Sequence, residues 1–139
     1  MFSILDISAS GLYAQRVRMD AIANNLANVA TTRDAQGRAN PYRRQDVIFK
    51  VGATHLGLRG EGVEVPVVID DPSPFRREYK PEHPDAVREG PDAGYVLLPN
   101  VEPVVEMVNM IDATRAYEAN VTVMDATKNL FSSALRILA

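Results

Sequence analysis

Few residues in this chain have the types and spacing that catalysis requires. Asp70 and Asp71 form an adjacent pair of carboxylates, the side chains that enzymes use for general acid and base catalysis. Neighbouring residues on an extended chain face opposite ways, however, and Asp-Asp-Pro is an ordinary turn sequence. His55 and His83 lie in separate turn-like contexts without the spacing of metal ligands. The sequence therefore predicts no catalytic residue, no metal site and no cofactor, with both histidines exposed in loops.

A cluster of asparagines has more specific chemistry. Asn24, Asn25 and Asn28 lie within about one helical turn, although asparagine is a mediocre helix former. Such a cluster fits the end of a helix that passes into the loop at Thr31 and Thr32. It equally fits a set of amide side chains that bond across helices and fix the register between subunits, as buried asparagines do in coiled coils. The periodicity leaves both interpretations open.

The elements that position these residues follow from the prolines. All nine prolines lie between Pro41 and Pro103, so both ends of the chain are free of the strongest helix breaker. The first end predicts a helix over about residues 6–28, with a seam at seven-residue intervals that Ile22 and Val29 supplement: Leu5, Leu12, Met19 and Leu26.

The second end has the stronger helical pattern. Ten seam positions alternate by three and four residues, and eight of them are apolar: Met107, Met110, Thr114, Tyr117, Val121, Met124, Lys128, Phe131, Leu135 and Leu138. Pro103 fits the first turn, where its missing N–H does no harm, and Asn100 is a candidate cap. The pattern predicts a long helix to the C-terminus.

Between the helices, turn sequences separate short strand candidates at residues 46–51, 63–69, 75–80 and 95–98. Pro66 interrupts the second of these, which predicts an edge strand or a bulge there. The predicted fold class is mainly α, with the N- and C-terminal helices paired as a coiled coil and a small irregular central β and loop region. Residues 1–30 and 101–139 form the paired helices, and residues 31–100 form the central region.

Composition excludes several classes of function. The 139 residues are 46% hydrophobic and 24% charged with a net charge of −3, which favours a folded chain without the basic surface that nucleic acid requires. The absence of cysteine excludes disulfides and thiolate metal sites. We also expect no small-molecule substrate. The first residues lack the pattern of a secretory signal, so the usual secretion route predicts a cytoplasmic protein.

Two marginal helices predict an assembly, because their seams bury too little apolar surface to fold alone. The alternative is that they pack onto the central region. The expected assembly interface comprises the two seams and the asparagines: Leu5, Leu12, Met19, Ile22, Asn24, Asn25, Leu26, Asn28, Met107, Met110, Tyr117, Asn120, Val121, Met124, Phe131, Leu135 and Leu138.

The terminal helices also carry four motifs: Ser10-Gly11-Leu12, Arg18-Met19-Asp20, Ile22-Ala23-Asn24-Asn25-Leu26-Ala27-Asn28-Val29 and Tyr117-Glu118-Ala119-Asn120-Val121. Together they resemble the signature of the bacterial flagellar axial proteins, the subunits of the rod and hook. Further motifs narrow this resemblance to a proximal rod subunit: Pro41-Tyr42-Arg43-Arg44-Gln45-Asp46-Val47, Asp71-Pro72-Ser73-Pro74, His83-Pro84-Asp85-Ala86, Gly94-Tyr95-Val96 and Pro99-Asn100-Val101. The chain departs from the pattern it resembles at Arg33-Asp34, where many axial proteins have Gly-Tyr, and at residues 88–91, which the resemblance implies lengthen a loop.

The resemblance implies a non-enzymatic structural subunit of the bacterial flagellar basal body. It implies manufacture in the cytoplasm, export without a cleavable signal through the flagellar type III export gate, and helical polymerisation in the periplasm to transmit torque. The implied partners are further copies of the chain, the proximal rod subunits FlgB and FlgF, the adaptor FliE and the distal rod protein FlgG. Two alternatives rest on the residues themselves: a coiled-coil adaptor that binds a partner helix through the C-terminal seam, and a small hydrolase that uses Asp70, Asp71 or Glu78.

Overall fold

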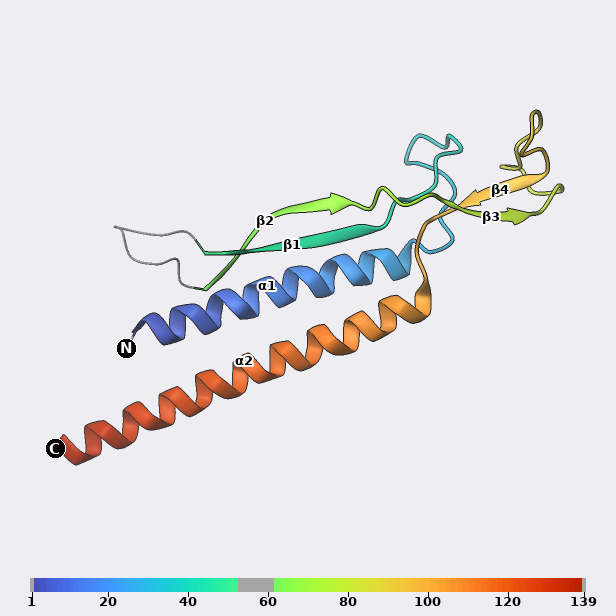
Figure 1. The fold of residues 1–139 in the computed structure, drawn as a ribbon. Helices are drawn as coiled ribbons and strands as arrows, with labels where there is room; N and C mark the ends of the chain where they lie inside the picture. The colour runs from blue at the N-terminus through green and yellow to red at the C-terminus, as the bar shows by residue number, and fades with distance from the viewer. Residues whose placement is uncertain (1, 53–61, 139) are drawn as a thin grey trace.

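The structure is a computed structural model that describes residues 2–52 and 62–138 (Figure 1). Within these residues the chain forms two long helices and two small two-stranded sheets, in the order α1 (Phe2–Ala27), β1 (Gln45–Val51), β2 (Val63–Asp70), β3 (Arg76–Tyr79), β4 (Tyr95–Leu98) and α2 (Pro103–Leu138). The predicted fold class, mainly α with a small central β region, is confirmed. The four strands agree with the predicted segments to within one residue at each end.

The elements form an elongated molecule in which α1 lies between the β1–β2 hairpin and α2 (Figure 1). The two helices run antiparallel, since Asn25 near the end of α1 bonds Glu106 in the first turns of α2. Both termini therefore lie at one end of the molecule, while the β3–β4 hairpin extends beyond the other. Of the two helices, α1 packs onto the central hairpin, as the alternative interpretation expected, whereas α2 packs onto α1.

The start of α2 follows from its proline. Pro103 occupies the first helical position, where a residue without an N–H loses no hydrogen bond, and the Glu106 amide donates to the Glu102 carbonyl at 3.0 Å. The prediction that Asn100 caps this helix is wrong. Its side chain instead accepts a hydrogen bond from the Arg44 amide at 2.8 Å and donates to the Asp71 carbonyl at 3.2 Å.

The β1–β2 hairpin lies against α1 through alternate residues. Its antiparallel register shifts where Phe49 of β1 faces Val65 and Pro66 of β2, which is the bulge that the proline predicts. The Val63 amide donates to the Ser10 hydroxyl of α1 at 3.0 Å. Gly62 lies so close to this hydroxyl that a Cβ atom would collide with it, and its φ of +80° also favours glycine.

The interior contains several small side chains and few large apolar ones. The buried apolar residues are Ala14, Ala21, Ile22, Val96, Pro99, Val101 and Ala113, and the buried polar residues are Ser8, Asn25 and Glu106. Alanine and serine let the elements approach closely but bury little apolar area. Neither α1 nor α2, as far as the structure describes them, is long and apolar enough to cross a membrane.

Candidate functional site

Of the carboxylates and histidines considered for catalysis, Asp71 and His83 have structural partners. Asp71 accepts a hydrogen bond from the Ser73 amide at 2.8 Å, the geometry of an Asx turn. Hydrogen bonds from Ser73, together with the Arg44 guanidinium, lower the pKa of Asp71. The His83 ring accepts from the Asp85 amide at 3.1 Å, and His55 lies outside the described residues. Across residues 2–52 and 62–138, no group of three or more histidines and carboxylates is placed to hold a metal ion.

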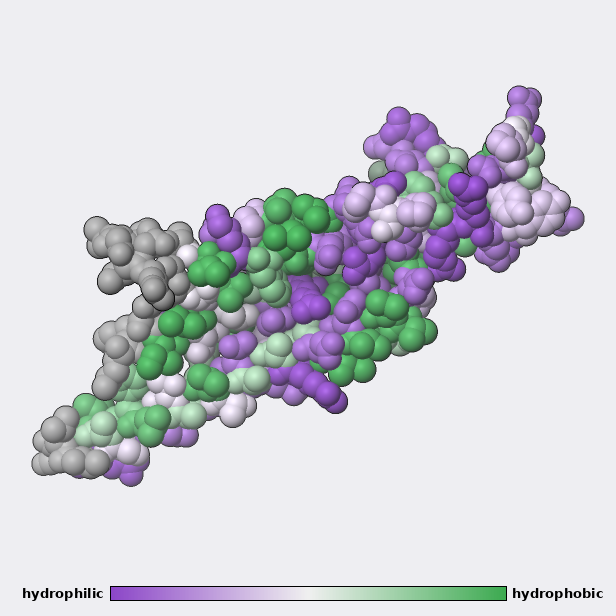
Figure 2. Space-filling model, in the orientation of Figure 1, coloured by the Kyte–Doolittle hydropathy of each residue, from purple (hydrophilic) through white to green (hydrophobic). Residues whose placement is uncertain are grey.

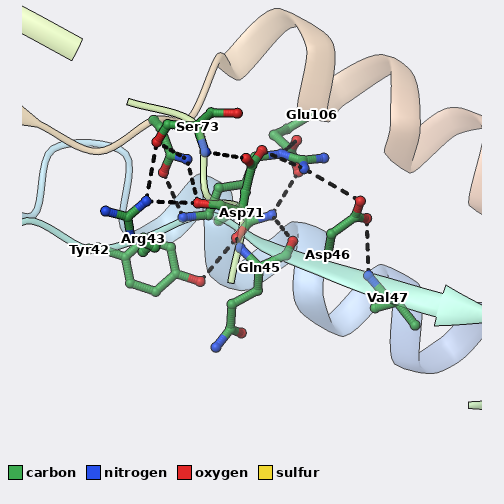
Figure 3. Close-up of polar contacts among 11 residues, drawn as sticks. Tyr42, Arg43, Gln45, Asp46, Val47, Asp71, Ser73 and Glu106 are labelled. Carbon is green, nitrogen blue, oxygen red and sulfur yellow. Dashed lines mark hydrogen bonds and ion pairs between the residues drawn. The ribbon is translucent and has the colours of Figure 1, made fainter. Parts of the chain in front are cut away.

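The buried Asn25 side chain joins three parts of the chain. Its partners Tyr42, Gln45 and Glu106 are labelled in Figure 3. Its Oδ1 accepts from the Gln45 amide at 2.8 Å and from the Tyr42 hydroxyl at 3.0 Å. Its Nδ2 donates to the Gln45 carbonyl at 2.9 Å and to Glu106 Oε2 at 3.0 Å. The amide therefore pairs with both backbone groups of Gln45, as a neighbouring strand would, and all its hydrogen-bonding capacity is used.

Glu106 is the second buried member of this junction. It is 0% exposed, and its Oε1 lies 2.9 Å from Nε of Arg44. Burial lowers the pKa of Arg44, but the hydrogen bond and charge of Glu106, together with the charges of Asp46 and Asp71, more than offset this effect, so the pKa of Arg44 is raised. Burial, and then the charges of Asp70 and Glu106, raise the pKa of Tyr42. A buried carboxylate with both oxygens bonded is a strong structural constraint, because removal of either partner would leave an unpaired charge or amide.

The junction extends to the turn after β2 and to the segment before α2. Arg44 Nη1 lies 3.3 Å from Asp71 Oδ2, and the Asp71 amide donates to the Arg44 carbonyl at 2.8 Å. Arg43 donates to the Asp71 carbonyl at 2.9 Å, and its guanidinium lies 4.3 Å from the centre of the Phe75 ring. We call the set Asn25, Tyr42, Arg44, Gln45, Asp71, Asn100 and Glu106 the polar junction.

A smaller cluster around Asp85, called the Asp85 clamp, joins two loops. One loop contains Arg33, and the other contains residues 88–91; these are the two places where the sequence departs from the flagellar axial pattern. Asp85 accepts from the Thr32 hydroxyl at 2.8 Å and from Arg33 Nε at 2.8 Å. Hydrogen bonds from Arg33 and Thr32 lower the pKa of Asp85. Arg33 therefore has a defined role, which is to bind the 31–42 loop to the 80–94 loop.

The contact between α1 and α2 differs from the predicted seam by one residue. One half of the α2 seam is as predicted: Met110, Tyr117, Met124 and Phe131 are half-buried. The other half consists of Glu106, Ala113, Asn120 and Thr127, each one residue before a predicted position. Of those predicted positions, Thr114 still contacts α1, since its hydroxyl lies 3.8 Å from Sδ of Met19. A Cβ added to Gly11 would lie 3.1 Å from Asn120 Oδ1, so the helices approach closely there. Small and polar residues face α1 because larger side chains would separate the helices.

This shift sorts the predicted interface residues into two groups. Those buried or half-buried within the chain are Leu5, Leu12, Met19, Ile22, Asn25, Leu26, Asn28, Met110, Tyr117, Asn120, Met124 and Phe131. Those exposed are Asn24, Met107, Val121 and Leu135. Leu138 is the last residue of α2, and its side chain lies outside the described part of the chain.

The asparagines divide between the two interpretations. Asn25 bonds across helices, although to its own chain. Asn28 ends the helix, since its Nδ2 donates to the Asn24 carbonyl at 2.9 Å and its Oδ1 accepts from Thr31 at 3.1 Å.

The outer side of α2 carries exposed apolar side chains. Val104 is 69% exposed, Met107 50%, Val108 53% and Ile111 52%, and their spacing of three and four residues places them on one face. We call these four residues the α2 patch. Figure 2 shows apolar surface over this part of α2 and over the β1–β2 hairpin, where the exposed residues are Ile48, Phe49, Val51, Val67, Val68 and Ile69. Contiguous apolar surface of this kind marks interaction sites.

Sequence periodicity alone did not identify most of the polar junction. Tyr42, Arg44 and Gln45 lie in one motif of the family resemblance, and Asp71 and Asn100 lie in two others. Glu106 could have been identified from the sequence in another way. It lies seven residues before Ala113, which makes it a charged residue at a repeat position of the α2 seam that faces α1. That identification depends on the seam being placed one residue earlier than the apolar pattern indicates.

Comparison with known proteins gives matches at both ends and along the whole chain. The family profile described as "Flagella basal body rod protein" matches residues 5–33, and the profile described as "Flagellar basal body rod FlgEFG protein C-terminal" matches residues 92–137. The protein named flagellar basal-body rod protein FlgC from Borreliella burgdorferi is 45% identical, over 99% of this chain and 97% of that protein. Its namesake from Bacillus subtilis is 45% identical over 98% and 97%, and that from Yersinia enterocolitica 40% over 99% and 97%.

Proposed function

The chain belongs to the family of the flagellar basal-body rod protein FlgC, and we propose that it is a structural subunit of the proximal rod, the drive shaft that crosses the periplasm. Its role is to form and stabilise a polymer, not to catalyse a reaction. The observation that supports this best is the α2 patch, because a 36-residue helix covered on one side by α1 leaves an apolar face for neighbouring subunits.

The proposed polymer is helical and is held together through the terminal helices. In it, residues 1–30 and 101–139 pair as a coiled coil in an inner tube, and residues 31–100 lie outside. Met107, Val121 and Leu135 then contact neighbouring subunits, since they are exposed in the isolated chain. The half-buried seam residues stabilise the subunit itself. Those seam residues whose exposed part contacts a neighbouring subunit also belong to the proposed interface.

The small interior fits export through the flagellar type III channel. A chain that buries few large apolar side chains has little stability to lose when it passes the export gate unfolded. It then gains apolar contacts from its neighbours in the rod. The proposed neighbours are copies of the same chain, the proximal rod subunits FlgB and FlgF, the adaptor FliE and the distal rod protein FlgG.

Torque requires that force on one part of a subunit reach the others. The polar junction bonds α1, α2 and the start of the β1–β2 hairpin to one another, and the Asp85 clamp bonds the two outer loops. We infer that these contacts transmit load between the inner helices and the central region.

Deletion of the gene, followed by electron microscopy of isolated basal bodies, tests the proposal. The expected result is membrane rings without a rod, with the rod restored by the wild-type gene. Intact rods and hooks in the deletion strain would exclude a rod subunit. In that case a stable complex of fixed size with one partner helix would support the coiled-coil adaptor instead.

A further inference from the structure

The apolar contacts between α1 and α2 repeat along the helices. On α1 the residues Leu5, Leu12, Met19 and Leu26 recur every seven positions, and on α2 so do Met110, Tyr117, Met124 and Phe131. If the helices slid past each other by one heptad, about 10.5 Å, apolar residues would again face apolar residues. Coiled-coil-like seams of this kind specify their register poorly without a polar contact.

One polar contact that does not repeat is the one between Asn25 and Glu106. Both side chains are 0% exposed, and Nδ2 of Asn25 lies 3.0 Å from Oε2 of Glu106. Arg44 bonds the other oxygen of Glu106 at 2.9 Å, and Arg44 is itself bound to the turn at Asp71. A slide of α2 in either direction would break the Asn25–Glu106 and Arg44–Glu106 bonds. It would separate the carboxylate of Glu106 from both of its partners and leave one buried N–H of Asn25 without an acceptor, which is costly.

One slipped register has a partial substitute for this pair. Sliding α2 so that Glu106 moves seven positions toward the N-terminus of α1 would bring it near Arg18, which lines the same cavity as Arg44. Asn25 would still lose Glu106, and Arg44 would lose it as well. The native register is therefore favoured by the complete set of bonds and not by a single charge pair.

We propose that Asn25, Arg44 and Glu106 form a register lock that selects one alignment of α1 against α2. This property belongs to the single chain and does not depend on the proposed function. It determines the shape of the end that holds both termini, where Ile4 and the last turns of α2 enclose a shallow apolar notch of about 340 Å³. A slip of one heptad would move that end by about 10.5 Å and remove the notch.

Cysteine pairs can report the register because the chain has no cysteine. Gly11→Cys with Asn120→Cys reports the native register, since a Cβ at residue 11 would lie 3.3 Å from Asn120 Cγ. Gly11→Cys with Ala113→Cys, or with Thr127→Cys, reports a slip of one heptad in either direction. In the native register those pairs are about 10 Å further apart along the helix, too far for a disulfide.

The test introduces Asn25→Leu and Glu106→Leu together into each cysteine pair of the full chain. Arg44 remains paired with Asp71, so no charge is left without a partner. The matched control is Asn24→Leu with Glu102→Leu, which makes the same changes at exposed positions. The chains are oxidised, and intramolecular disulfides are counted by mass spectrometry after circular dichroism has verified the helix content.

In chains that carry Asn25→Leu and Glu106→Leu, the yield of the native disulfide should fall to about half of its yield in the control. The disulfides of the slipped registers should appear in its place. The control should form the native disulfide alone. If the double variant loses its helices, Glu106→Gln decides, because it keeps the shape of the side chain. That variant should form slipped disulfides in about a tenth of the chains. The decisive variant is the double variant if it keeps its helices, and Glu106→Gln if it does not. If that variant forms the native disulfide alone, the register lock is refuted, and the register is set by the short segment between β4 and α2.

Discussion

At the residue scale, the most constrained side chains of this protein are polar. Asn25 and Glu106 are completely buried, whereas most large apolar residues of α2 remain exposed. A buried amide with all its hydrogen bonds made contributes modestly to stability, but losing one partner costs far more than the bond contributed. The polar junction therefore determines how the helices and strands of this small protein are arranged. Single substitutions in it should lower the free energy of unfolding by more than substitutions at exposed positions do.

Asn25→Ala should destabilise the fold by about 2–3 kcal/mol, because it leaves the Gln45 backbone groups and one Glu106 oxygen without a partner. Asn24→Ala is the matched control, since Asn24 is exposed at the preceding position of the same helix. Its substitution should change the free energy of unfolding by less than about 0.5 kcal/mol. Urea unfolding followed by circular dichroism measures both. Equal effects of the two substitutions would contradict the importance of the junction.

The lowered pKa of Asp71 predicts a pH dependence. Because its folded pKa lies below the unfolded value of about 3.9, the ionised carboxylate stabilises the fold above that pH, and the contribution is lost as the pH falls through the folded pKa. Asp71→Asn should therefore lower stability at neutral pH and flatten its decline between about pH 5 and pH 2. Unfolding curves across this range provide the test. A wild-type slope retained in the variant would show that Asp71 does not contribute to it.

At the element scale, the two helices and four strands follow from local sequence, but the faces they present do not. Proline placement, seven-residue periodicity and turn sequences predicted every element within the described residues. Apolar periodicity then placed Met107 and Val121 in the α1–α2 contact, where the structure has Glu106 and Asn120. Apolar residues show which faces are covered in the assembled state, and a helix with several neighbours has more than one such face. The contact between Gly11 and Asn120 is likewise a tertiary property.

Gly11→Leu should wedge α1 and α2 apart and destabilise the fold by about 1–3 kcal/mol, despite the better helix propensity of leucine. The reason is the 3.1 Å that separates a Cβ at this position from Asn120 Oδ1. Ala9→Leu, on an exposed position of the same helix, should have little effect. Adding Asn120→Ala to Gly11→Leu should recover part of the loss. Thermal unfolding of the four chains measures these differences, and a neutral Gly11→Leu would refute the close contact.

The α2 patch predicts a variant that folds but does not assemble. Val108→Asp with Ile111→Asp should leave the helix content unchanged, because the two side chains are 53% and 52% exposed, yet abolish motility by placing charges in a subunit contact. Thr122→Asp with Asn129→Asp adds the same charge to exposed polar positions of α2 and should remain motile. Soft-agar swarming of complemented deletion strains gives the readout. Normal swarming of the patch variant would remove the patch from the interface.

At the scale of the whole molecule, an elongated shape, a small interior and an apolar outer helix face fit one another. The fold class and the family were predictable, since both depend on patterns and motifs spread along the sequence. The polar junction was not predictable from periodicity, because it joins Asn25 to Glu106 across 81 positions and Arg44 to Glu106 across 62. Only a folded chain brings such residues together, and their types are equally common on solvated surfaces.

The most direct measurement is a cryo-electron microscopy map of isolated basal bodies from cells that make this chain. The map should show copies of it in the proximal rod, with α1 and α2 in the inner tube and in the register of the isolated chain, and with neighbouring subunits covering Val104, Met107, Val108 and Ile111. A rod map in which this face of α2 is open to solvent, or in which the chain is absent, would refute the proposed rod subunit.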